Sequence, residues 1–197
     1  MLLPSLSAAE RFVTNESNGF TWIQQGKAYP ILVDSQEDKG VLRAVANLQT
    51  DAGKVTGATP EIIHSPSGNR ILIVGSVENS SWIKQLVQAG KIPAADLKGK
   101  REKYILQTVK QPVEGVEEAI VIAGSDKRGT IYGIYELSRQ MHQRTLYLLI
   151  GSVLCLWACN YYNVQTVFKF RFIQPITFSY QSGESVANHT IPYFFTY

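Results

Sequence analysis

The sequence predicts an α/β fold, an α+β sandwich in which one mixed β-sheet is covered by about three helices. Between residues 19 and 141, short runs rich in β-branched residues alternate with stretches in which apolar residues recur at helical spacing. The order along the chain is strand, strand, helix, three times over. This order predicts a sheet with helices packed on it.

The first unit is expected to be a hairpin followed by a helix. Residues 20–25 and 29–33 are expected to be its strands, joined by a Gly-Lys turn. Asp34 or Ser35 is expected to cap the helix, and Gly53 to end it. The residues at helical spacing, which form its predicted buried face, are Val41, Leu42, Val45 and Leu48.

The second unit consists of two short strands, at residues 61–63 and 71–74, and a helix capped by Asn79 or Ser80. The predicted buried face of that helix is Trp82, Ile83, Leu86 and Val87.

The third unit repeats the arrangement with longer strands. Strands are expected at residues 104–109 and 119–123, the latter apolar on both faces and therefore central. Asp126 is expected to cap a last helix that runs through Met141. The predicted buried face of this helix is Ile131, Ile134, Tyr135 and Leu137.

Composition changes sharply after Met141. Residues 142–197 contain four charged side chains, 13 of the 21 aromatic residues and both cysteines. We therefore expect an N-terminal segment (1–18), an α/β domain (19–141) that folds alone, and a divergent apolar and aromatic tail (142–197). The first nine residues are similar to the end of a secretory signal peptide, but lack its basic start.

Three interpretations of the tail stay open. Its uncharged, strongly apolar part, Leu146–Cys159, is 14 residues long, which is short for a membrane span. A membrane-associated segment is one interpretation, and a genuine extra structural element is another. The third is that a frameshift or gene rearrangement has replaced the original continuation.

The charges indicate a solvated surface. The net charge is +3, and basic and acidic residues are interleaved over the first 141 positions. This balance argues against a nucleic-acid partner and against a polybasic membrane patch.

No catalytic, cofactor-binding or metal-binding residue is expected. Adjacent carboxylates at element starts point in different directions, and those at opposite ends of one helix lie far apart, so none matches the facing pair of a glycosidase. The pairs considered are Glu37 with Asp38, Glu117 with Glu118, and Asp126 with Glu136. The scattered residues that make no zinc set are His64, His142, His189, Cys155 and Cys159.

Two glycine-containing segments are incomplete versions of nucleotide-binding motifs. Residues 124–130 follow a strand and open a helix, but Thr130 stands where a phosphate-binding lysine is required. Residues 71–79 contain one of the three glycines of a dinucleotide motif. We expect the glycines to permit tight turns, so a small nucleotide-binding enzyme is disfavoured.

The run from Ser125 to Ser138, Ser-Asp-Lys-Arg-Gly-Thr-Ile-Tyr-Gly-Ile-Tyr-Glu-Leu-Ser, resembles the last helix of the N-terminal domain of family 115 glycoside hydrolases. Two-domain hexosaminidases and family 67 α-glucuronidases have looser versions. Gly129 and Gly133 lie one turn apart and are expected to let the helix approach the sheet closely. The resemblance covers roughly residues 10–141 and includes residues 26–34, 39–45 and 71–75.

The resemblance implies a non-catalytic domain that packs against a catalytic (β/α)₈ barrel. Such enzymes remove glucuronic acid from xylan, and the family implies a periplasmic or secreted location. The 56 residues after Met141 are too few for a barrel, so the chain is expected to be a truncated form, inactive alone. The alternative is a free-standing carbohydrate-binding or interaction module, with its tail at a membrane, which would need Trp22 or Trp82 exposed.

Overall fold

The computed structural model describes residues 13–14, 20–24, 26–142 and 176–178. Three features discussed above lie outside these residues: the signal-like start, the apolar run Leu146–Cys159 with its two cysteines, and His189. Within the described part of the chain, no helix has both the length and the apolar character needed to cross a membrane.

A five-stranded mixed sheet forms the centre of the molecule and confirms the predicted fold class. Its order is β5 (Ile62–Ile63), β4 (Ile31–Val33), β6 (Arg70–Ser76), β8 (Glu118–Gly124) and β7 (Tyr104–Lys110). The first four strands are parallel, and β7 pairs antiparallel with β8 over seven residues. Because β6 and β8 have neighbours on both sides and helices on both faces, their apolar residues are continuous rather than alternating.

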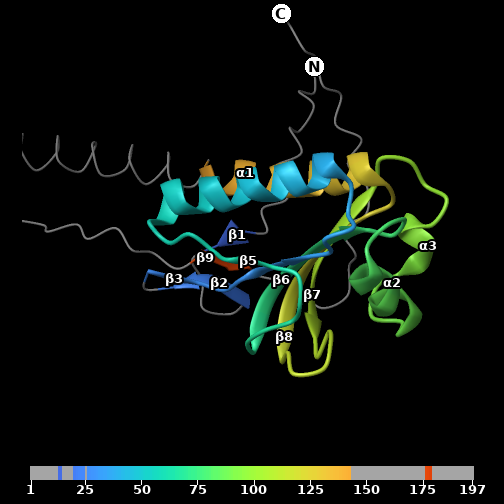
Figure 1. The fold of residues 1–197 in the computed structure, drawn as a ribbon, viewed down its shortest axis with the longest axis horizontal. Helices are drawn as coiled ribbons and strands as arrows, with labels where there is room; N and C mark the ends of the chain where they lie inside the picture. The colour runs from blue at the N-terminus through green and yellow to red at the C-terminus, as the bar shows by residue number, and fades with distance from the viewer. Residues whose placement is uncertain (1–12, 15–19, 25, 143–175, 179–197) are drawn as a thin grey trace, which may run out of the picture.

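Helices cover both faces of this sheet. On one face lie α1 (Lys39–Thr56) and a helix that covers residues 127–142, here called the closing helix. On the other lie α2 (Ser81–Gln88) and the four-residue α3 (Ala94–Leu97). Figure 1 shows α1 and the gold closing helix side by side along the sheet, with α2 and α3 away from them.

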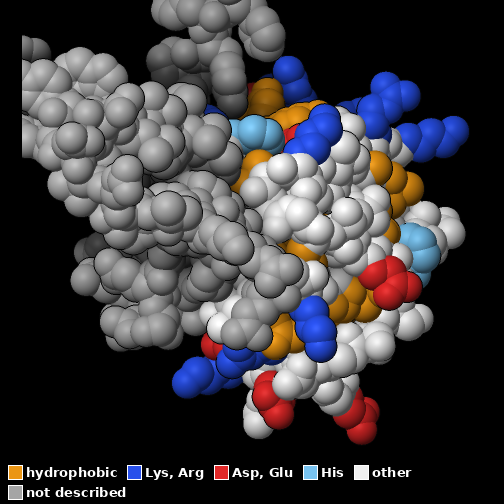
Figure 2. All heavy atoms as spheres, turned by 90° about the vertical axis from the view of Figure 1, so that its left-hand side faces the viewer, with side chains coloured by type: hydrophobic (Ala, Val, Ile, Leu, Met, Phe, Trp, Pro, Cys, Tyr) orange, Lys and Arg blue, Asp and Glu red, His pale blue; other side chains and the backbone are white. Residues whose placement is uncertain are grey.

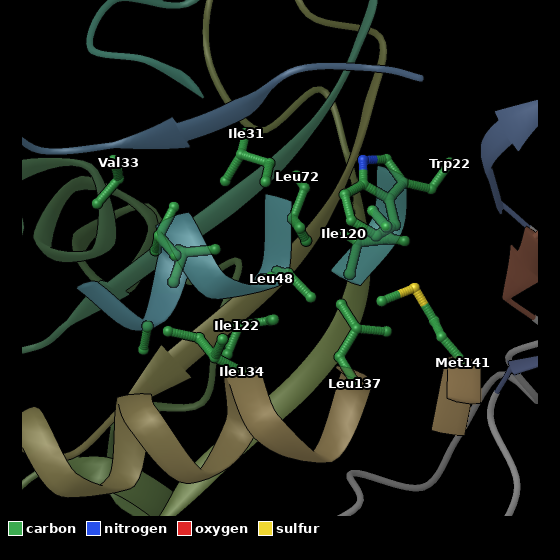
Figure 3. Close-up of a cluster of buried hydrophobic side chains, with 14 of the residues drawn as sticks. Trp22, Ile31, Val33, Leu48, Leu72, Ile120, Ile122, Ile134, Leu137 and Met141 are labelled. Carbon is green, nitrogen blue, oxygen red and sulfur yellow. The ribbon is translucent and has the colours of Figure 1, made fainter. Parts of the chain in front are cut away.

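Successive residues of each strand divide the core into two clusters. In β6, Leu72 and Val74 face α1 and the closing helix, whereas Ile71 and Ile73 face α2. The first cluster also takes in Leu48, Ile134 and Leu137 from the two helices, all at most 1% exposed (Figure 3). Burial of this many side chains supplies the main driving force for folding of the sandwich.

The ends of α1 differ from the expected ones. Asp38 caps the helix by accepting a hydrogen bond from the Gly40 amide (2.8 Å), so the expectation of Asp34 or Ser35 was wrong. The helix also passes through Gly53 and ends at Gly57, whose φ of 74° is left-handed. A glycine at that backbone conformation ends a helix without steric cost.

The other two predicted caps are confirmed. Ser80 caps α2 through a hydrogen bond from the Ile83 amide, and Asp126 caps the closing helix through one from the Gly129 amide (2.8 Å). In α2, Ile83 and Leu86 are buried, whereas Trp82 and Val87 are only partly so.

The closing helix packs through glycine, as expected. A Cβ on Gly133 would lie 2.7 Å from the Ile122 side chain, and one on Gly129 would overlap the backbone carbonyl of Lys103. Tyr135 was wrongly assigned to the buried face: it is 43% exposed, and its hydroxyl accepts a hydrogen bond from the Asn47 side chain of α1 (3.0 Å).

A second, smaller sheet covers the end of the first core cluster. Its order is β1 (Val13–Thr14), β9 (Ile176–Phe178), β2 (Phe20–Gln24) and β3 (Lys27–Ala28). The hairpin is therefore shorter than expected: β2 pairs with the two residues of β3, and residues 31–33 join the large sheet instead. Pro30 stands at the change of sheet, where its missing amide hydrogen cannot extend the hairpin.

One strand of the small sheet comes from the tail. β9 pairs antiparallel with both β1 and β2 and lies between them. The large sheet and the described helices all lie before residue 143. The strand β9 of the tail, Ile176–Phe178, was not predicted from the sequence.

Candidate functional site

The edge formed by the carboxyl ends of β4, β6 and β8 is where an α/β sheet would bind a ligand. The chain leaves β4 for α1 on one face and leaves β6 for α2 on the other. The connections diverge between these neighbouring strands, which makes a topological switch point.

Glu37 fills the space between the two connections. Its carboxylate is 4% exposed and accepts hydrogen bonds from the Ser76 amide (2.9 Å) and the Ser76 hydroxyl (2.8 Å). The Asp38 amide donates to it as well, at 3.2 Å. A buried carboxylate with three donors is satisfied, and it ties the segment before α1 to the end of β6. The expectation of a solvated Glu37 was wrong.

Asp34 makes a second link across the same point. It accepts hydrogen bonds from the Ser81 amide (3.0 Å) and hydroxyl (2.5 Å), so a residue at the end of β4 holds the start of α2. Burial acts to raise the pKa of Asp34, but the bonds from Ser81 and the Gln36 amide, with the nearby His64, bring the net pKa below its usual value. The carboxylate form is therefore the one that the folded chain stabilises.

The glycine-containing segment after β8 is closed by packing. A Cβ on Gly124 would overlap the backbone nitrogen of Thr130, and Thr130 is fully buried. Its hydroxyl donates to the backbone carbonyl of Asp126 (2.9 Å). The segment thus folds tightly on itself, which supports the expectation of a structural turn.

The remaining carboxylates considered as pairs have separate structural contacts. Glu118 lies 3.8 Å from Arg70, and Glu136 pairs with Arg139 on the next turn of the closing helix. Glu117 is exposed at the opposite edge of the sheet, where its carbonyl accepts a hydrogen bond from the Gln111 amide. These contacts give Glu118 and Glu136 basic partners and leave Glu117 on the surface.

Of the histidine and cysteine residues discussed above, His64 and His142 lie in the described part of the chain. Each contacts a backbone carbonyl through Nδ1 at 2.9 Å, of Val33 and Ser138 respectively. Among the described residues, no group of three His, Cys, Asp or Glu side chains could hold a metal ion.

The aromatic side chains of the described residues do not form a platform for sugar. Trp22 is fully buried, and its indole donates to the Tyr29 carbonyl (2.8 Å). Trp82 is half-buried against the second core cluster. Tyr135 is the exposed large apolar side chain of the described residues.

The fold and this edge together define a class of protein: an α+β sandwich domain in which Glu37 and Asp34 link the chain connections at the switch point, here called the closed edge. The model of the family described as "Glycosyl hydrolase family 67 N-terminus" matches residues 21–137, more than half of the chain. The chain belongs to this family. It is an N-terminal domain of the kind found in glucuronidase-type glycoside hydrolases, as the resemblance implied.

Two solved structures are similar. A family GH115 4-O-methyl-alpha-glucuronidase with specificity for decorated arabinogalactans is 30% identical, with a TM-score of 0.50 over 62% of this chain. The structure of CpGH84D is 11% identical, with a TM-score of 0.47 over 73% of this chain. The chain spans 14% of the length of the first protein and 21% of the second. A search of curated proteins gave no match.

Proposed function

We propose that this chain is a non-catalytic accessory domain of a glycoside hydrolase and does not act on a glycoside by itself. The observation that carries the proposal is the closed edge. Glu37 and Asp34, the carboxylates at the switch point, are engaged with Ser76 and Ser81 rather than facing a common space. A glycosidase needs two carboxyl groups facing each other across the scissile bond, with room for the sugar between them.

The substrate of the parent activity follows by analogy. The 30% identical relative is a 4-O-methyl-alpha-glucuronidase with specificity for decorated arabinogalactans, so the catalytic partner of this domain would remove a glucuronic acid unit from a decorated polysaccharide. The resemblance of the sequence to xylan-degrading enzymes favours glucuronoxylan as that polysaccharide. The supporting role is to pack against the catalytic (β/α)₈ domain, and a periplasmic or secreted location fits such a substrate.

An NMR titration of the full chain tests the closed edge. Glucuronic acid and its 4-O-methyl form are added while the amide resonances of Ser76 and Ser81 are followed. We expect no saturable shift at either amide, because each already donates to a carboxylate. Saturable shifts centred on these two amides would reveal a sugar site at the edge and contradict the proposal.

A further inference from the structure

A cluster of cations, here called the basic surface, forms where the loop between α3 and β7 meets the start of the closing helix. This part of the molecule lies at the right in Figure 1, where α1 and the closing helix both begin. The basic surface consists of Lys98, Lys100, Arg101, Lys103, Lys127 and Arg128.

Hydrogen bonds hold the loop against the helix. The Glu102 amide donates to the Asp126 carboxylate (2.9 Å), and the Lys103 amide donates to the Ser125 hydroxyl (3.0 Å). The Ser125 amide donates back to the Lys103 carbonyl (2.8 Å). On its other side the loop starts from Leu97, which is fully buried. The cations are therefore presented on a fixed backbone, which lowers the entropy lost when a ligand binds.

The positive charge that this surface presents comes mainly from its loop. Lys127 lies 3.9 Å from Asp38, and Arg128 is paired with Glu102 (2.6 Å), so the two cations at the start of the helix have acidic partners. Three cations of the loop, Lys98, Lys100 and Arg101, are exposed. The face drawn in Figure 2 shows side chains of both signs.

We propose that the basic surface binds the carboxylate groups of an acidic polysaccharide, one that carries uronic acid side groups. This inference rests on the proposed function, which places the domain in an enzyme that works on such polymers. Lysine and arginine donate strong, charge-assisted hydrogen bonds to carboxylates. Binding through exposed cations does not require a platform of stacking aromatics, and among the described residues Tyr135 is the one large hydrophobic side chain that is exposed.

A nucleic acid is the less favoured polyanion. Binding of single strands combines a charged groove with aromatic side chains on which bases stack. Here the charge is confined to one loop and one helix start, and Tyr135 is the exposed large aromatic side chain among the described residues. Duplex DNA and anionic vesicles therefore enter the test as competitors.

The test measures the affinity of the full chain for glucuronoxylan by affinity electrophoresis at low ionic strength. The same polymer with its carboxyl groups reduced to alcohols serves as the uncharged control. We expect retardation by native polymer, loss of it with reduced polymer, and weakening as salt is added. Equal retardation by both polymers, or by neither, would overturn the proposal. So would tighter binding of DNA or of anionic vesicles than of glucuronoxylan.

Variants then locate the site. Lys98→Gln, Lys100→Gln and Arg101→Gln combined should weaken binding about tenfold, since each exposed ion pair contributes little alone and three together approach that factor. The matched control removes three exposed lysines elsewhere: Lys27→Gln, Lys54→Gln and Lys84→Gln. An equal loss in the control would show that net charge, and not this surface, governs binding.

A variant that is expected to strengthen binding distinguishes loss of the site from loss of binding through misfolding. Glu102→Gln removes the partner of Arg128 and should strengthen binding of the polymer. Weakened binding by this variant would count against the proposal. The NMR titration distinguishes this proposal from the proposed function. Shifts at residues 98–101 with unchanged Ser76 and Ser81 amides support both proposals. Shifts at the Ser76 and Ser81 amides contradict only the closed edge.

Discussion

Gly133 lies on the side of the closing helix that faces the sheet, where a Cβ would meet Ile122 at 2.7 Å and Tyr104 at 3.1 Å. We predict that Gly133→Leu lowers the melting temperature. Overpacking costs about 1–3 kcal/mol, more where the backbone must move. The gain in helix propensity from replacing glycine, about 1 kcal/mol, is smaller.

Thermal unfolding of the variant and the parent chain measures this effect. Tyr135→Leu is the control, because Tyr135 is 43% exposed on the same helix and should tolerate the change. An unchanged or raised melting temperature for Gly133→Leu would mean that the helix turns a different face to the sheet.

Asp34 gives a pH-dependent prediction. Its pKa is lowered in the folded chain below the ordinary 3.8, so the carboxylate contributes stability that is present above that pH. The contribution is lost as the pH falls through the lower, folded-state pKa. We expect Asp34→Asn to cost about 1 kcal/mol at neutral pH, similar to a helix cap.

Urea unfolding of the parent chain and Asp34→Asn between pH 2.5 and 7 tests the sign of this effect. The difference in free energy of unfolding between the two chains should become smaller only below about pH 4. If this difference stays constant over the whole pH range, or grows toward acid, the hydrogen bonds from Ser81 do not stabilise the Asp34 carboxylate.

The burial of two residues, Glu37 and Tyr135, was predicted wrongly from the sequence. Glu37 resembles any acidic residue before a helix, and its burial depends on Ser76, 39 positions away. Tyr135 has helical spacing suited to a core residue, but it is 43% exposed, and its hydroxyl accepts a hydrogen bond from Asn47 of α1. Both outcomes depend on tertiary neighbours that a local pattern does not contain.

The ends of helices and strands were predictable from the sequence where a strong local signal marks them. Asp126 was predicted as the cap of the closing helix and Asn79 or Ser80 as that of α2, and the structure confirms Asp126 and selects Ser80. Before α1 there are several acidic or hydroxyl residues that could cap the helix. Asp34 accepts a hydrogen bond from the Ser81 hydroxyl instead and does not cap α1. The strand change at Pro30 was missed because two short apolar strands around a glycine also fit a simple hairpin.

The tail strand gives a prediction for an element. β9 lies between β1 and β2, with Thr177 opposite Thr14 and Thr21. Proline lacks the amide hydrogen that a central strand needs, so Thr177→Pro should open the small sheet. We expect faster amide hydrogen exchange at Phe20–Gln24, with β6 and β8 still protected by the large sheet.

Thr177→Val is the matched control, because valine keeps the amide and favours strands. It should leave exchange at β2 as in the parent chain. If proline also leaves β2 protected, the small sheet holds without β9, and the tail is as separable as its composition suggests.

For the whole molecule, the fold class was predictable and the strand order was not. The alternation of strands and helices is local information, and it gave a mixed sheet covered by helices. Which strands are neighbours depends on long-range pairing, such as β6 between β4 and β8. The basic surface is partly local: four of its cations lie within residues 98–103, and only their proximity to residues 127–128 depends on the fold.

The central claim is that this domain supports catalysis without performing it. The most direct measurement is release of glucuronic acid from glucuronoxylan by the full chain, purified free of host glucuronidase, beside a family GH115 glucuronidase as positive control. We predict release no greater than that of buffer alone. Turnover at enzyme-like rates would contradict this account and would require a carboxylate pair other than those placed at the closed edge.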